Sequence, residues 1–164
     1  MTSRLVITVP GEPIERPRAR NRVAYADGKP FARPYHPKGS LTSKDSKEVR
    51  WAKSHAWSDA VMQAVLHALP PDAPWSGPIR CDIEFFMPRL KKHAARKYGT
   101  GELWHVNTPD RDNLQKAIED AITKAGLWRD DKQSCDGRIS KKYHAVESGP
   151  GVVITIEKIE EATR

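Results

Sequence analysis

Acidic side chains stand at both ends of residues 108–133, which read TPDRDNLQKAIEDAITKAGLWRDDKQ. Asp110 and Asp112 come just before a stretch with helical periodicity, and two more acids follow the end of that stretch. If the chain enters the helix in an extended conformation, side chains two positions apart share a face, so Asp110 and Asp112 can point the same way. Two carboxylates on one face form half of a site for a hard cation such as Mg²⁺.

Three further residues could complete such a site. Asp130 or Asp131 can supply a third acid after the helix, and Lys116 lies one turn inside it. A magnesium ion held by these acids could activate a water molecule and stabilise the charge that develops on a phosphodiester. A neighbouring lysine could hold the scissile phosphate or stabilise the negative charge of the transition state. This spacing is compatible with metal-dependent phosphodiester hydrolysis.

A simpler interpretation assigns the same charges to the helix alone. Carboxylates are favoured at helix N-termini, where free N–H groups and the positive end of the dipole meet them, so Asp110 or Asp112 can cap the helix. Lys116 lies four residues after Asp112 and four before Asp120, and it can bridge them at about 0.2–0.5 kcal/mol per pair. Gly126 is well placed as a left-handed C-cap. The charges alone leave both interpretations open.

The rest of the chain predicts the elements that must position these residues. The strands predicted from apolar alternation and turn signals are 3–9, 79–87, 136–146 and 151–159. Alanines at every fourth position predict a long helix over 46–68, capped by Asp45, and we interpret its alanine and tryptophan stripe as packing surface. The order β-α-β-α-β-β predicts one α/β (α+β) domain over residues 1–164, with helices packed on a mixed sheet.

Charge favours a polyanionic partner. The 164 residues carry a net charge of +7 and have a pI near 9.5, which leans toward nucleic acid. Basic residues concentrate in two irregular loops, at about 11–44 and 88–104. The residues expected to bind nucleic acid are Arg16, Arg18, Arg20, Arg22, Arg89, Lys91, Lys92, Arg96 and Lys97. Without the acidic motif, the ordinary explanation of either run is a solvated surface.

Several other classes of function find no support. No glycine-rich phosphate loop occurs, so we expect no nucleotide cofactor. His105 and Asn107 weakly resemble a histidine–asparagine nuclease motif, but no partner histidine follows at helical distance, so we interpret them as polar loop residues. Cys81 and Cys135 form no CxxC pair and are expected to be free thiols. No apolar run approaches the ~18 residues of a membrane span, and we expect a cytoplasmic protein with no membrane partner.

Residues 109–133 resemble the signature of the RusA family of Holliday-junction resolvases. That signature is roughly D-x-D-N-x-x-K, then a helix, then a-G-x-x-x-D-D, and the match includes each acid, the lysine and the D-A-x-x-K-A-G end of the helix. The first strand with its GEPIERPRAR run and the terminal hairpin, which the predicted strands 136–146 and 151–159 would form, agree more loosely with the bacteriophage-type branch. Extra length between 20 and 45 and an expanded basic loop at 89–104 depart from the pattern and leave substrate preference open.

The resemblance implies a RusA-like fold and a homodimeric, Mg²⁺-dependent endodeoxyribonuclease, with Mn²⁺ as an alternative ion. Such an enzyme resolves four-way DNA junctions by paired symmetric nicks in recombination and repair. The matching residues are Asp110, Asp112 and Asp131 as metal-binding catalytic acids, Lys116 as the catalytic lysine, and Asn113 and Asp130 as supporting residues. A less selective nuclease for flaps and forks, and a DNA-binding protein without catalysis, are the alternatives.

Helix length limits how Asp131 can reach the other acids. From Asp112 to Gly126, about 14 residues of helix span roughly 21 Å. The next residues, about five of them, span at most about 18 Å when fully extended. Asp131 therefore reaches Asp112 of its own chain only if residues 127–131 run back along the helix. The alternative is a site shared by two subunits of a dimer, and of the two we expect the intrachain return.

Overall fold

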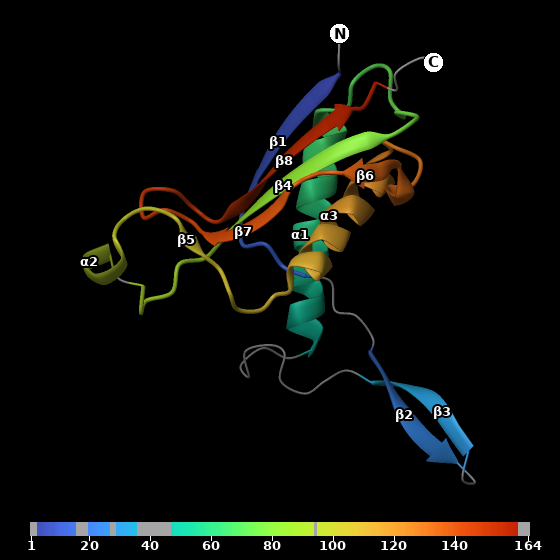
Figure 1. Ribbon diagram of the computed structural model, residues 1–164, viewed down its shortest axis with the longest axis vertical. Coiled ribbons are helices and arrows are strands. Elements are labelled where there is room, and N and C mark those ends of the chain that lie inside the picture. The colour runs from blue at the N-terminus through green and yellow to red at the C-terminus, as the bar shows by residue number, and fades with distance from the viewer. Residues whose placement is uncertain (1–2, 16–19, 27–28, 36–46, 94, 161–164) are drawn as a thin grey trace.

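A computed structural model of the protein describes residues 3–15, 20–26, 29–35, 47–93 and 95–160. In chain order the elements are β1 (Arg4–Pro10), β2 (Arg20–Ala26), β3 (Lys29–Tyr35), α1 (Lys47–His67), β4 (Ile79–Met87), α2 (Ala95–Tyr98), β5 (Leu103–Trp104), α3 (Arg111–Ala125), the 3-10 helix η1 (Asp131–Gln133), β6 (Ser134–Asp136), β7 (Ile139–Tyr143) and β8 (Gly151–Lys158). Two long helices lie against one mixed sheet (Figure 1). The predicted α/β class, with helices packed on a mixed sheet, is confirmed.

The main sheet has the strand order β1-β8-β4-β7-β5, and β6 pairs with the beginning of β4. β8 runs antiparallel to both of its neighbours, β1 and β4, so β4 separates β8 from β7 and the terminal hairpin predicted for these two strands is wrong. β4 and β7 run parallel, with Ile83 opposite Ile139 and Met87 opposite Tyr143. Alternate side chains of β4 are buried, as expected for a strand with one face against a core.

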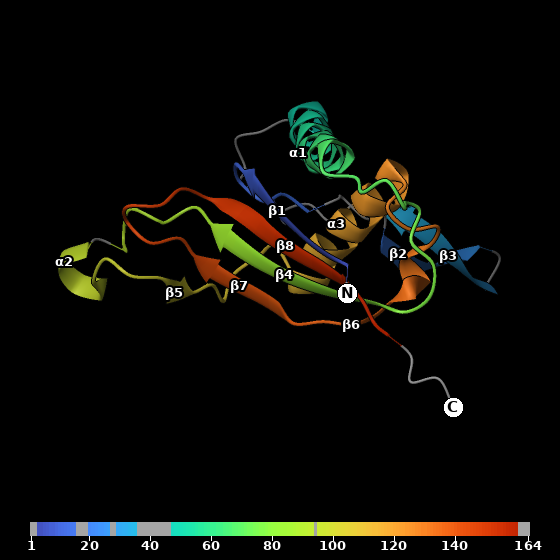
Figure 2. The same ribbon diagram turned by 90° about the horizontal axis from the view of Figure 1, so that it is seen from above.

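Helices α1 and α3 cover the same face of this sheet (Figure 2). The core between the layers includes Phe85 and Ile154 from the sheet and Leu114 and Ile118 from α3, all fully buried. Burying each side chain of this size contributes about 1.5–3 kcal/mol, so this packing fixes α3 on the sheet. The opposite face of α3 is left for polar residues, among them Lys116, whose side chain is 41% exposed.

Helix α1 forms where the sequence predicts it, but its buried face differs from the predicted one. The buried residues are Ser54, Trp57, Ser58, Val61 and Val65. The alanines at 52, 56 and 60 are exposed, so interpreting the whole stripe as packing surface was wrong for these positions. Trp57 and the two valines bury more apolar area than alanines can, and they decide which face turns inward. The expected cap Asp45 lies outside the described residues. None of the described helices has the length and apolar character needed to cross a lipid bilayer.

The first basic loop contains a two-stranded antiparallel sheet, which the sequence did not predict. β2 and β3 pair from Arg20 opposite Tyr35 to Ala26 opposite Lys29. Two prolines in β3 obscured the strand pattern, but a hairpin tolerates them because each strand has one unpaired edge. Figure 1 shows this hairpin beyond one end of α1, away from the main sheet.

Candidate active site

Helix α3 begins directly after Asp110, which occupies the N-cap position with an extended backbone of φ −72° and ψ 143°. Its carbonyl accepts a hydrogen bond from the N–H of Leu114 at 3.2 Å, but its carboxylate makes no capping hydrogen bond. Asp112 lies in the first turn and is exposed. Asp110 therefore occupies the N-cap position through its backbone alone, and the prediction that its carboxylate caps the helix is wrong.

The far end of α3 turns the chain back on itself. Gly126 adopts the left-handed conformation, with φ 79°, and its N–H points to the carbonyls of Ile122 and Thr123, which confirms the predicted C-cap. Beyond it, the Leu127 carbonyl accepts a hydrogen bond from the N–H of Trp75 at 2.6 Å. Leu127 is fully buried and so is anchored where the return begins. This anchored turn directs the following residues back along α3.

Lys116 meets Asp131 of its own chain, and their side chains form a hydrogen-bonded ion pair. A second ion pair joins Lys116 Nζ to Asp120 Oδ1 at 3.0 Å. Hydrogen bonds to Asp131 and then to Asp120 raise the pKa of Lys116. The chain after α3 thus returns within one subunit, and the acid that follows the helix reaches the lysine one turn beyond Asp112.

Asp130, directly before Asp131, has different contacts. Its carboxylate accepts a hydrogen bond from the N–H of Lys132 at 3.0 Å, and this bond lowers the pKa of Asp130. The side-chain oxygen of Gln133 accepts from the N–H groups of Arg129 at 3.0 Å and Asp130 at 3.3 Å. Reciprocal bonds of this kind form a capping box. Asp130 therefore holds the turn that presents Asp131.

The carboxylate of Glu15 lies beside α3, which the sequence did not predict. Asn113 Nδ2, in the first turn of α3, donates a hydrogen bond to Glu15 Oε2 at 3.0 Å. The hydroxyl of Ser54 in α1 donates to the Glu15 carbonyl at 3.1 Å, which fixes the backbone there. Burial lowers the pKa of Lys141 in β7, and the charges of Asp110 and Glu15 oppose that shift. Glu15, Asp110 and Lys141 are therefore electrostatically linked at the start of α3.

The segment leading into α3 is fixed to β7. Lys141 Nζ donates hydrogen bonds to the carbonyls of Asn107 at 2.7 Å and Pro109 at 2.5 Å. Asn107 Nδ2 donates to the hydroxyl of Tyr143 at 2.9 Å, and the His105 ring packs on Tyr143 with 4.5 Å between centroids. Burial lowers the pKa of His105. These contacts hold the loop before α3 in place, and they set the position of Asp110 at the end of that loop.

The acids near α3 have the donor chemistry that Mg²⁺ requires, because hard cations prefer carboxylate oxygens. Within the described part of the chain, however, no three histidine, cysteine, aspartate or glutamate side chains form a group arranged to hold a metal ion. The carboxylate of Asp131 contacts the Lys116 ammonium instead. These carboxylates are thus the type of ligand that Mg²⁺ prefers, but the third acid, Asp131, is paired with Lys116.

Comparison with known proteins identifies the family. A family model described as Endodeoxyribonuclease RusA matches residues 10–157. The chain belongs to the RusA family. Crossover junction endodeoxyribonuclease RusA from Escherichia coli strain K12 is 32% identical over 108 residues, which cover 66% of this chain and 74% of the relative. The proteins of that name from Shigella sonnei and Enterobacteria phage 82 show the same identity and coverage.

Membership of the RusA family confirms two predictions made from the sequence, the family and the nuclease activity on DNA. The matched residues 10–157 span every part of the candidate site, from Glu15 to Lys141. The roles of the individual site residues are not decided by the match, and they rest on the contacts described above.

The basic residues of this RusA-family chain differ in what their side chains do. Arg16 and Arg18 lie outside the described residues, and Arg20 and Arg22 belong to β2. Arg96 lies in the short helix α2.

Among the other basic residues of the second loop, Arg89 is directed into the loop itself. Its guanidinium donates to carbonyls of that loop, at 2.5 Å to Gly99 and 2.7 Å to Gly101, so it organises the loop's shape. Lys91 and Lys92 are exposed. The exposed Lys97 lies with its Nζ 5.1 Å from the centre of the Tyr98 ring.

Proposed function

We propose that this RusA-family endonuclease resolves four-way DNA junctions by paired symmetric nicks, in DNA recombination and repair. One observation carries the assignment of the site: Asp131 returns to Lys116 on α3, one turn after Asp112. Helix capping alone gives no reason for the acid that follows the helix to return to a lysine in its first turns. The name of the relatives, crossover junction endodeoxyribonuclease, supports the junction as substrate.

In this proposal Asp110, Asp112 and Asp131 are the catalytic acids and hold the metal ion, with Asn113 and Asp130 in supporting roles. When bound, Mg²⁺, or Mn²⁺ in its place, supplies a water of lowered pKa and neutralises charge on the phosphodiester. Lys116 is a cation that can contact the scissile phosphate and stabilise its transition state. Asn113 holds Glu15 beside the site through their hydrogen bond of 3.0 Å. Asp130 keeps the turn in place through its bond to the N–H of Lys132.

Basic residues would hold the DNA around these acids, because phosphates are repelled by carboxylates that are not neutralised. We assign this role to both loops: to Arg16, Arg18, Arg20 and Arg22 in the first, and to Lys91, Lys92, Arg96 and Lys97 in the second, whose shape Arg89 maintains. Residues 1–164 would then act as one endonuclease domain.

We also propose a homodimer, because two matched nicks across an approximately two-fold junction require two equivalent sites. The exposed side of α1 is the surface we assign to the interface. It carries the exposed alanines at 52, 56 and 60 together with Trp51 and Leu66, which are 37% and 40% exposed. Small side chains of this kind allow two helices to approach closely.

A panel of DNA substrates tests the function directly. A synthetic four-way junction, a flap and a linear duplex of matched sequence are incubated with the full chain, with and without Mg²⁺. We expect symmetric nicks in the junction only, and none with the Asp112→Asn variant. Equal cutting of flap and junction would favour the less selective branched-DNA nuclease. Binding without any cutting would favour a non-catalytic DNA-binding protein.

A further inference from the structure

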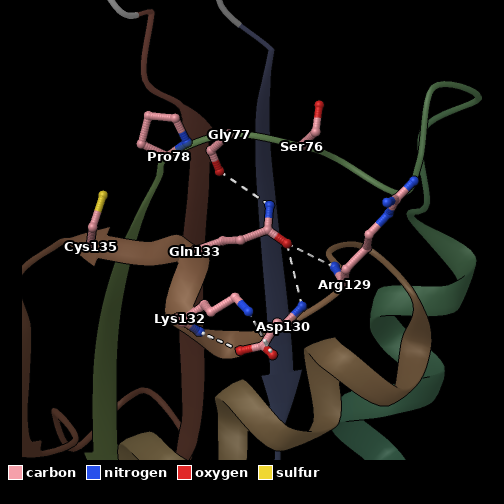
Figure 3. A pocket seen from close by; sticks show the side chains of 8 residues that line it. All are labelled: Ser76, Gly77, Pro78, Arg129, Asp130, Lys132, Gln133 and Cys135. Carbon is pink, nitrogen blue, oxygen red and sulfur yellow. Dashed lines mark hydrogen bonds and ion pairs between the residues drawn. The ribbon is translucent and has the colours of Figure 1, made fainter.

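A cleft lies beside the turn that presents Asp131. It has a volume of about 590 Å³ and runs between the loop 76–78 and the turn 129–135 (Figure 3). That volume falls within the range of small-ligand sites. The candidate active site uses Asp131 and Lys116, which do not line this cleft.

The amide of Gln133 fixes the two walls of the cleft to each other. Its nitrogen donates hydrogen bonds to the carbonyls of Trp75 and Gly77, both at 3.1 Å. Its oxygen accepts from the N–H groups of Arg129 and Asp130, as Figure 3 shows. One side chain therefore ties the loop to the turn, and the cleft has a defined shape.

The charges along the cleft are mainly positive. Arg129 is exposed, and no hydrogen bond or ion pair of its guanidinium is found among the described residues; in Figure 3 this side chain extends away from Gln133. The side chain of Lys132 is 80% exposed and pairs with Asp130 at 3.5 Å. Two cations and one carboxylate leave a net positive charge at the opening. The Ser76 hydroxyl adds a neutral donor to the lining.

We propose that this cleft binds a phosphate of the DNA backbone close to the one that is cut. The proposal rests on the proposed nuclease function, because the cleft and the catalytic acids share the turn 130–131. A DNA strand carries one phosphate per about 3.4 Å of axis, so a strand with one phosphate at Lys116 places others near this turn. Arg129 and Lys132 would each contact the DNA backbone, and Gln133 would hold the cleft in a fixed position relative to Asp131.

The salt dependence of DNA binding tests the cleft. Arg129→Gln and Lys132→Gln, singly and together, are compared in the inactive Asp112→Asn background, with Kd for a four-way junction measured over a range of salt concentrations. Removing one cation that binds a phosphate should reduce the slope of log K against log salt by about one. The matched control is Arg4→Gln, which removes the same charge from β1, where Arg4 pairs with Glu157 at 3.0 Å. We expect the control to leave the slope unchanged.

The outcomes separate this proposal from the proposed function. If the slopes for the Arg129 and Lys132 variants equal that of the control, the cleft does not bind a phosphate and is only a solvent-filled hollow. If the natural chain binds but nicks no DNA, the nuclease proposal fails, while the slopes still decide the cleft. If the natural chain binds no DNA, both proposals fail.

Discussion

Lys116 is the residue that links the two ends of the acidic motif. Its ammonium pairs with Asp131 after the helix and with Asp120 one turn along. A cation held between carboxylates is oriented before substrate arrives, and orientation of this kind contributes to catalysis because no reorganisation is needed during the reaction. The same pairing also holds Asp131 close to the first two turns of α3.

Replacing Lys116 with glutamine should slow cutting far more than it weakens binding. Loss of a donor that stabilises the transition state typically lowers kcat by about 10²–10³-fold. Single-turnover nicking of a junction at saturating enzyme measures the effect. Lys124→Gln, an exposed lysine in the last turn of the same helix, removes the same charge and is the control. Equal rates for the two variants would mean that Lys116 has no part in the chemistry.

Glu15 supports a second prediction at this scale. Glu15→Ala removes the acceptor of the Asn113 amide and a negative charge near Lys141. A hydrogen bond to a charged group contributes about 1.5–3 kcal/mol, and if this contribution is lost from the transition state of the reaction, nicking slows by about tenfold or more. Glu12→Ala, an exposed acid of the same loop, is the control. Rates are compared after circular dichroism has shown that both variants are folded, and the idea fails if Glu15→Ala cuts as fast as Glu12→Ala.

The sequence predicted Asp131 as a partner of the helix but not Glu15, and the reason is distance along the chain. Spacing within residues 108–133 limits where Asp131 can go, because one helix and a short return connect it to Lys116. Glu15 lies 98 positions from Asn113, in a run that attracts notice for its arginines. Only the packing of the loop after β1 against α1 brings the two together.

At the scale of elements, the left-handed turn at Gly126 decides where the chain goes after α3. Gly126→Ala should destabilise the protein by about 1 kcal/mol, because a Cβ disfavours the positive φ of 79°. For a chain of this size, that change lowers Tm by about 2–4 °C. Scanning calorimetry measures the shift. Gly149→Ala, at a glycine that does not have a positive φ and where an added Cβ would meet nothing within 4 Å, should leave Tm nearly unchanged.

Elements with strong periodicity were predictable, and those that depend on pairing partners were not. β4 alternates over its whole length, and α3 has a clear apolar face between a plausible cap and a glycine. By contrast, β5 and β6 have two and three residues, too few to show a pattern, and they exist because β7 and β4 offer open edges. On α1, Ser54 and Ser58 are buried, so a prediction from the polarity of the residues alone chose the wrong buried face of the helix.

At the scale of the whole molecule, the contact of Lys116 with Asp131 within one chain predicts that each subunit of the proposed homodimer carries a complete site. Heterodimers of Asp112→Asn and Asp131→Asn chains, separated by two affinity tags, should therefore not nick a junction, since each subunit lacks one acid of its own site. Heterodimers of natural and Asp112→Asn chains should nick one strand. Restored cutting in the doubly mutant heterodimer would show instead that the site is assembled from two chains.

The place of β8 in the sheet has a consequence for the biosynthesis of the enzyme. β8 lies between β1 and β4 and pairs with seven residues of the one and eight of the other, yet it is translated after both. Until it emerges from the ribosome, β1 has no neighbour in the sheet and the layer beneath α1 and α3 is incomplete. Contacts so distant in sequence also slow folding. A nascent chain would thus acquire the proposed nuclease site only after residues 151–158 have been made.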